Sequence, residues 1–165
     1  MIEKIVSGAQ TGADRGGLDA AIAKGVPIGG WIPQGRRAED GTVPEKYAGL
    51  VETRSTGYLV RTELNVKDSD ATLILSRNVE GAITGGTKRT AEFARQHGKP
   101  CRFCLVKVGE VDPVQLSAAL QFVRENNVGV LNVAGPRESK QPGVQEASRV
   151  FMEAVIDALR GTGGK

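Results

Sequence analysis

The stretch KIVSGAQTGADRGGLDAAIAK (residues 4–24) decides the fold. Residues 4–7 form a short run that is typical of a strand, with Ile5 and Val6 at its centre, and residues 8–13 are rich in glycine and other small residues. Residues 14–24 carry apolar side chains at helical spacing. The stretch therefore predicts a strand, a glycine loop and a helix in direct succession.

The same alternation continues to the end of the chain. Strands are predicted at 26–31, 71–76, 101–108 and 128–134. Helices are predicted at 58–67, after residues 85–87 as far as about residue 96, at 113–127 and at 144–159. The inner stripe of the last helix is predicted to hold Val150, Phe151, Ala154, Val155 and Ala158. Apolar strands separated by helices predict an α/β fold, a Rossmann-like three-layer sandwich with a mostly parallel sheet. We expect one domain over residues 1–160 and a flexible tail over 161–165.

Composition excludes several classes of protein. The chain of 165 residues has 22 basic and 19 acidic residues and a net charge of +3, which is too even a balance for a dedicated nucleic-acid binder. No apolar run approaches the roughly 18 residues of a membrane span, and the N-terminus has no signal-peptide pattern. We expect a cytoplasmic protein that binds neither membranes nor nucleic acids.

Two cysteines, Cys101 and Cys104, form a C-x-x-C within a predicted strand. Residues three apart in a strand point to opposite faces, and a zinc site would need two further ligands. With His97 as the one histidine, we interpret the pair as reduced core thiols and expect no metal site.

Two glycine-rich segments follow predicted strands, where ligands bind in open parallel sheets. In residues 7–14, two glycines let the backbone close on an anion at the start of a helix. Residues 84–90 supply a double glycine and hydroxyl groups, which is the strongest local signal for phosphate. The alternatives are a tight turn capped by Asp14 and a glycine turn capped by Thr87.

Two further segments place basic residues after strands. The long loop 31–41 holds two adjacent arginines that could grip an oxyanion, and 132–140 combines glycine with basic side chains. The alternatives are a solvated run of charges and a mobile surface loop, while Trp31 could stack on a heterocycle or pack in the core. Together the basic residues predict an electropositive cleft. They are Arg15, Arg36, Arg37, Lys88, Arg89, Arg137 and Lys140.

Five motifs together resemble the molybdenum cofactor carrier proteins, a branch of the SLOG superfamily of Rossmann-like folds. They are SGAQTGADR at 7–15, GWIPQGRRAEDG at 30–41, RTELNVKDSD at 61–70, TGGT at 84–87 and LNVAGPRESK at 131–140. The resemblance implies a homo-oligomer, a dimer or tetramer, that binds molybdenum cofactor as cargo. That ligand is a pterin with a dithiolene and a phosphate, so it would suit an electropositive cleft.

The superfamily also contains the lonely-guy phosphoribohydrolases, which implies an alternative enzymatic function. Thr90 stands where those enzymes have a catalytic glutamate, so Glu39, Asp40 or Glu138 would have to replace it. We therefore assign no catalytic residue. A nucleotide-sensing domain is a third hypothesis, because such folds host many functions. The predicted ligand-binding residues are Gly8, Gln10, Thr11, Gly12, Arg36, Arg37, Arg61, Gly85, Gly86, Thr87, Thr90, Arg137, Ser139 and Lys140.

Overall fold

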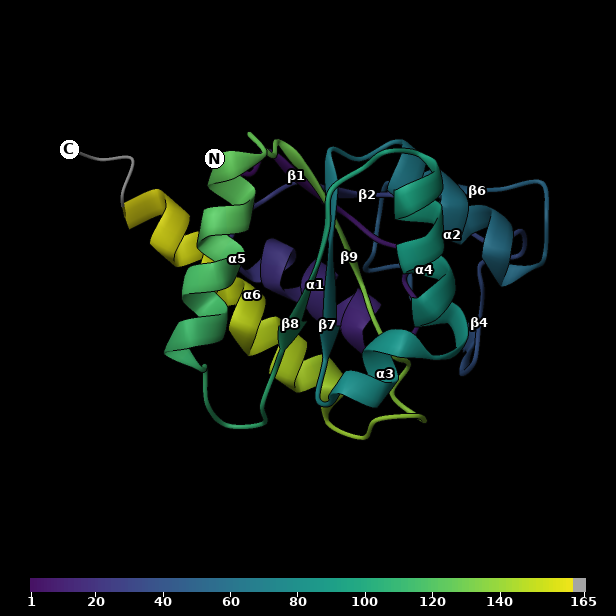
Figure 1. The fold of residues 1–165 in the computed structure, drawn as a ribbon. Helices are drawn as coiled ribbons and strands as arrows, with labels where there is room; N and C mark the ends of the chain where they lie inside the picture. The colour runs from purple at the N-terminus through teal and green to yellow at the C-terminus, as the bar shows by residue number, and fades with distance from the viewer. Residues whose placement is uncertain (162–165) are drawn as a thin grey trace.

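The core of the protein is a five-stranded sheet with the strand order β2-β1-β9-β7-β8 (Figure 1). In the computed structural model, which describes residues 1–161, all four neighbouring pairs of these strands are parallel. The strands are β1 (Lys4–Val6), β2 (Ile28–Gly29), β7 (Ala71–Ser76), β8 (Cys101–Leu105) and β9 (Val130–Ala134). Their carboxyl ends therefore lie along one edge of the sheet, and the predicted α/β Rossmann-like class is confirmed.

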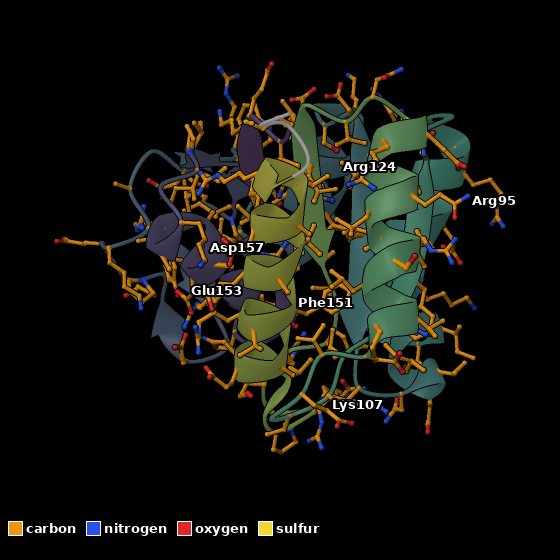
Figure 2. The ribbon with its side chains drawn as sticks, turned by 90° about the vertical axis from the view of Figure 1, so that its left-hand side faces the viewer. Arg95, Lys107, Arg124, Phe151, Glu153 and Asp157 are labelled. Atoms are coloured by element: carbon orange, nitrogen blue, oxygen red, sulfur yellow. The ribbon has the colours of Figure 1, made fainter. Side chains whose placement is uncertain are left out.

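Helices cover both faces of the sheet (Figure 1). They are α1 (Ala13–Ala23), α2 (Tyr58–Lys67), α3 (Val79–Ile83), α4 (Gly85–Gln96), α5 (Pro113–Glu125) and α6 (Val144–Gly161). Helix α6 packs against α1 and α5 on one face, and α2 packs against α4 on the other. Figure 2 looks onto the first of these faces, where α6, carrying Phe151, lies beside α5. None of the helices within residues 1–161 combines the length and apolarity that a membrane crossing needs.

The last helix buries a stripe that is rotated from the predicted one. Phe151 and Val155 are buried as expected, whereas Val150, Ala154 and Ala158 are only half-buried. Their places in the core are taken by Met152, Ile156 and Leu159. Burial of each large side chain contributes about 1.5–3 kcal/mol, so this stripe anchors α6 to the sheet and to α1.

The segment after α1 departs from the single strand predicted at 26–31. It forms β2 and then β3 (Trp31–Ile32), which leaves the main sheet and pairs with β6 (Val51–Glu52). Gly30 separates the two strands with a φ of 126°, and a Cβ added there would clash with the Ser7 carbonyl oxygen, so no side chain would fit. The chain therefore turns away from the sheet at this glycine.

Several small elements were not predicted, among them β6. The loop that follows β3 contains an antiparallel hairpin of β4 (Arg37–Ala38) and β5 (Gly41–Thr42). Helix α3 is a single short helix whose N-cap, Asn78, accepts a hydrogen bond from the Gly81 amide at 2.7 Å. Elements this short carry no periodicity that a sequence could reveal.

The two cysteines are free thiols on β8, with Cys104 buried and Cys101 half-buried. Burial raises the pKa of both thiols to about 11, so both stay protonated near neutral pH. Of the tail predicted at 161–165, Gly161 ends α6 and the remaining positions lie outside the described residues.

Candidate anion-binding site at the carboxyl edge of the sheet

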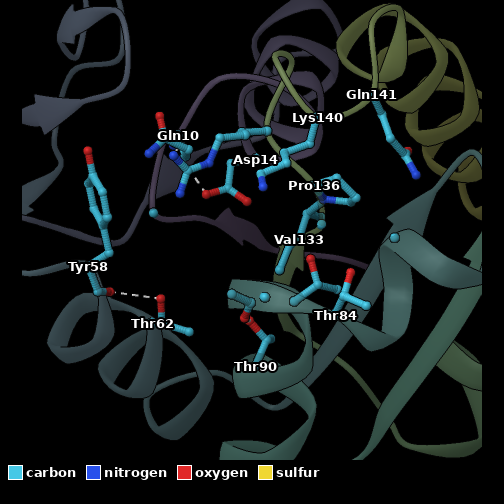
Figure 3. A pocket seen from close by; sticks show the side chains of 18 of the residues that line it. Gln10, Asp14, Tyr58, Thr62, Thr84, Thr90, Val133, Pro136, Lys140 and Gln141 are labelled. Atoms are coloured by element: carbon cyan, nitrogen blue, oxygen red, sulfur yellow. Dashed lines mark hydrogen bonds between the residues drawn. The ribbon is translucent and has the colours of Figure 1, made fainter.

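A cavity of about 510 Å³ opens at the carboxyl ends of the central strands. Its walls come from the loops after β1 and β9, from α2 and from the α3–α4 segment. Figure 3 shows Tyr58 and Thr62 along one side and Thr84 and Thr90 along another, with Asp14 and Lys140 projecting toward the space between them. The volume is within the range of about 300–1,000 Å³ that small-molecule sites occupy.

Most of the predicted ligand-binding residues line this cavity. They are Gly8, Gln10, Arg61, Gly85, Gly86, Thr87, Thr90, Arg137 and Lys140. Thr11, Gly12, Arg36, Arg37 and Ser139 do not line it. Parallel topology thus brings residues from distant parts of the sequence to one place.

The N-terminus of α4 forms one wall of the cavity. The first-turn amides of Gly85, Gly86 and Thr87 precede the first intrahelical bond, which runs from the Lys88 amide to the Thr84 carbonyl at 3.2 Å. The N-cap is Thr84 and not Thr87, and the Thr84 hydroxyl instead donates to the Glu80 carbonyl at 2.9 Å. The wall therefore presents free N–H groups and a partial positive charge to the cavity.

Both glycines of this wall face open space. A Cβ added at Gly85 or Gly86 would have no atom within 4 Å, so a ligand could approach the backbone closely. Gly85 has a φ of 56°, a conformation that residues with side chains rarely adopt.

Arg61 forms the floor on the α2 side and is only 7% exposed. Its guanidinium donates to the Gly8 carbonyl at 2.7 Å and to the Thr62 hydroxyl at 3.2 Å. A Cβ at Gly8 would lie 2.7 Å from the Arg61 side chain, so glycine leaves room for it. Burial lowers the pKa of Arg61, and nearby Asp14 opposes this shift. None of the ion pairs within residues 1–161 involves Arg61.

Three guanidinium groups surround the ring of Tyr58 at the same side of the cavity. Arg37, Arg61 and Arg137 lie 4.9, 5.1 and 5.7 Å from its centroid. Arg137 also lies 3.8 Å from a Glu39 oxygen, which is the one ion pair of these three arginines in the described part of the chain. The cluster leaves this side of the cavity positively charged.

The predicted electropositive cleft is therefore built by fewer residues than expected. Arg61, Arg137 and Lys140 line the cavity, together with two carboxylates, Asp14 and Glu80. The other predicted basic residues lie outside it: Arg15, Arg36, Arg37, Lys88 and Arg89. Arg15 is bound to Asp40 through two contacts of 2.6 and 2.9 Å, and Arg89 pairs with Glu92 at 3.1 Å.

The remaining predicted residues hold the loops of the site together. Glu39 accepts hydrogen bonds from the hydroxyls of Thr11 and Ser139, and thereby joins three loops. The amide of Gly12 donates to the Gln145 side chain at 3.3 Å. Such bonds support the walls from behind.

Arg36 and Trp31 likewise bind within the protein. The Arg36 guanidinium donates to the carbonyls of Val43 and Pro44 at 3.2 and 3.1 Å. The indole N–H of Trp31 donates to Asp68 at 2.9 Å, away from the cavity.

Asp14 is a cavity residue that sequence reasoning treated only as a helix cap. The N-cap of α1 is Gly12, and Asp14 lies in the first turn with 7% of its surface exposed. It accepts a hydrogen bond from the Gln10 amide at 3.2 Å. Burial raises the pKa of Asp14 to about 6, although the charge of Arg61 opposes the shift.

Tyr58, Asn78 and Gln141 also line the cavity and were not predicted. Tyr58 follows a single glycine at the start of α2, and Asn78 and Gln141 each follow a single basic residue, so none of them stands in a glycine-rich or multiply basic segment of its own. The positions of Asn78 after β7 and of Gln141 after β9 carried a usable signal, because ligands bind after the strands of parallel sheets.

The fold and the site define a Rossmann-like α/β protein with a cavity at the carboxyl edge of its sheet. The chain belongs to the circularly permutated YpsA SLOG family, whose model matches residues 5–156. The predicted membership of the SLOG superfamily is therefore confirmed.

A solved structure is similar over nearly the whole chain. It is that of the "Putative molybdenum carrier protein" from Syntrophus aciditrophicus SB, which is 42% identical and has a TM-score of 0.83. The similarity covers 94% of this chain and 95% of that protein. None of the curated proteins matches the chain.

Proposed function

We propose that this protein binds and carries a small phosphate-bearing ligand, and that the ligand is molybdenum cofactor. The observation that carries the proposal is the cavity itself, which is lined both by the first-turn residues of α4 and by the buried cation Arg61. The name of the similar molybdenum carrier protein supports the choice of cargo. The volume of about 510 Å³ is sufficient for a pterin with its dithiolene and phosphate.

In this proposal the phosphate binds at the N-terminus of α4. The amides of Gly85, Gly86 and Thr87 donate to its oxygens, and Lys140 supplies a positive charge from the loop after β9. The pterin ring occupies the space between this wall and Tyr58. Binding and release then need no covalent chemistry.

The hydrolase alternative loses its predicted carboxylates. Glu39, Asp40 and Glu138 do not line the cavity, because each is engaged by neighbouring loops or side chains. The hydroxyl of Thr90 donates to the Gly86 carbonyl at 3.1 Å. The third hypothesis, a nucleotide-sensing domain, is still open, and identification of the bound ligand would test it.

The first test is mass spectrometry of ligands released from the purified protein, followed by calorimetric titration with molybdenum cofactor. We expect a pterin phosphate to be recovered. Recovery of a nucleotide, with base release from nucleoside monophosphates, would contradict the proposal and favour the hydrolase.

A pair of arginine variants tests where the ligand binds. We expect Arg137→Ala to weaken binding about tenfold or more, because it removes a cation that lines the cavity. Arg36→Ala is the matched control, since it removes the same charge from a residue bound to loop carbonyls outside the cavity. Equal losses in both variants would contradict the proposed position of the ligand.

The proposal also covers the cellular compartment and the oligomeric state of the protein. As a carrier it is expected to work in the cytoplasm as a homo-dimer or tetramer. Light scattering of the purified protein measures the oligomeric state, and a monomer at micromolar concentration would contradict this part.

A further inference from the structure

Asp14 is an unexpected group in a cavity built for an anion. Asp14 is buried, with 7% of its surface exposed, it lines the cavity, and its carboxylate points into that space in Figure 3. The Gln10 amide and the Ser7 hydroxyl are its hydrogen-bonding neighbours. A carboxylate has about four lone-pair positions, so acceptor capacity remains on the cavity side. A buried carboxylate next to a bound anion would be repelled unless the ligand also offers N–H donors to it.

Arg61 lines the same cavity as Asp14 and has donors to spare. Its charge opposes the rise that burial causes in the pKa of Asp14. A guanidinium has five N–H groups, and its two hydrogen bonds to the protein, to Gly8 and Thr62, use the Nη1 and Nε atoms. The Nη2 atom has no partner among residues 1–161, and the side chain lines the cavity. Asp14 and Arg61 together thus present acceptors next to donors.

We propose that Asp14 and Arg61 recognise the 2-amino-4-oxo edge that pterin and guanine share, and that the site thereby rejects adenine. This edge offers an amino N–H, a ring N–H and a carbonyl oxygen in a row. The carboxylate of Asp14 accepts both N–H groups, and Arg61 donates to the carbonyl oxygen. The inference rests on the proposed function, and it adds the residues that select the heterocycle.

Other heterocycles do not fit this pattern. Adenine offers one amino N–H beside a ring nitrogen that is an acceptor, which would face a carboxylate oxygen. Hypoxanthine has the ring N–H and the carbonyl but no amino group. A site that must leave a buried polar group unpaired discriminates strongly against such a ligand.

The first experiment uses the wild-type protein and needs no variant. Calorimetry compares GMP, IMP and AMP, and also 6-hydroxymethylpterin monophosphate with its lumazine counterpart, which has an oxygen in place of the amino group. We expect GMP and the pterin each to bind at least about tenfold more tightly than their analogues. The tighter of these two identifies the natural ring. Affinities within twofold of one another across the series would overturn the inference.

The second experiment removes the carboxylate. We expect Asp14→Asn to abolish the preference for the 2-amino compounds while binding of inorganic pyrophosphate stays the same or improves, because a negative charge is lost. Glu80→Gln is the matched control, since Glu80 is the other carboxylate that lines the cavity, and the preference should persist in it. If Asp14 had only a structural role, its substitution would weaken all ligands alike.

These results separate this inference from the function on which it rests. Binding of pyrophosphate without any preference among heterocycles would overturn the inference alone. Failure of pyrophosphate and of every phosphate ester to bind would overturn the proposed function, and the inference with it. Circular dichroism shows whether Asp14→Asn folds, and if it does not, the wild-type series decides.

Discussion

At the scale of single residues, the buried carboxyl of Asp14 makes stability depend on pH. Its pKa is raised from 3.8 to about 6, so the folded protein holds this proton more tightly than the unfolded chain does. The free energy of unfolding therefore falls as pH rises from about 4 to 6, by up to about 3 kcal/mol from this group. Above about pH 7, where the carboxyl is ionised in both the folded and the unfolded state, the contribution no longer changes.

The variant Asp14→Asn cannot lose a proton in this range. Relative to it, the wild-type protein should become less stable between pH 4 and pH 7, as measured by urea unfolding of the ligand-free proteins at both pH values. A difference between the two proteins that does not vary with pH would show that Asp14 keeps an ordinary pKa.

Individual side chains of the site were only partly predictable. Thr87, Arg137 and Arg36 all follow strands and carry the same kind of signal, yet only the first two line the cavity. Arg36 adopts a φ of 56° and its guanidinium turns onto backbone carbonyls of its own loop. The direction of a side chain in an irregular loop depends on such local bonds, which residue spacing does not report.

At the scale of elements, the approach of two loops depends on Gly12. It has a φ of 86°, and a Cβ there would lie 2.4 Å from the Pro136 carbonyl oxygen in the loop after β9. We expect Gly12→Ala to destabilise the protein by about 3 kcal/mol or more, since a strained backbone and a clash with another backbone combine.

Gly98, after α4, provides the control for this prediction. Its φ is also positive, at 62°, but a Cβ there would have no atom within 4 Å. Gly98→Ala should therefore cost only about 1 kcal/mol, from the backbone conformation alone. Urea unfolding of both variants measures the difference, and equal costs would mean that the two loops can separate freely.

Long elements were predicted well, and short ones were not. The bounds of α2 and β7 agree with the prediction, because ten residues of helical periodicity and a six-residue run centred on Leu73, Ile74 and Leu75 are strong patterns. The strand expected at 26–31 was wrong as one element, since Gly30 redirects the chain. That redirection results from contact with Ser7, which is distant in sequence.

At the scale of the whole molecule, the position of the site followed from topology. Once the strands are parallel, the segments after them must meet at one edge, and the cavity lies there. Its enclosed carboxylate and its aromatic side required the packing of α1 and α2 against the sheet. Tertiary packing of this kind leaves no local mark in a sequence.

Because the cavity draws on segments from residue 8 to residue 141, a bound ligand should stabilise the entire fold. At a concentration 100 times its Kd, a ligand that binds only the folded protein adds about 2.7 kcal/mol, which corresponds to a rise in Tm of about 5–10 °C for a chain of this size. Differential scanning calorimetry with GMP measures this rise, and Arg137→Ala at the same GMP concentration should show a smaller one.

Hydrogen exchange then locates the protection that accompanies this stabilisation. We expect slower exchange in the first turn of α4 and in the loop 135–141, both of which line the cavity. Helix α5 lies on the other face of the sheet and contributes nothing to the cavity, so its exposed amides should exchange as before. Protection centred on α5 would mean that the ligand binds away from the carboxyl edge, and the α4 amides would then have no part in holding its phosphate.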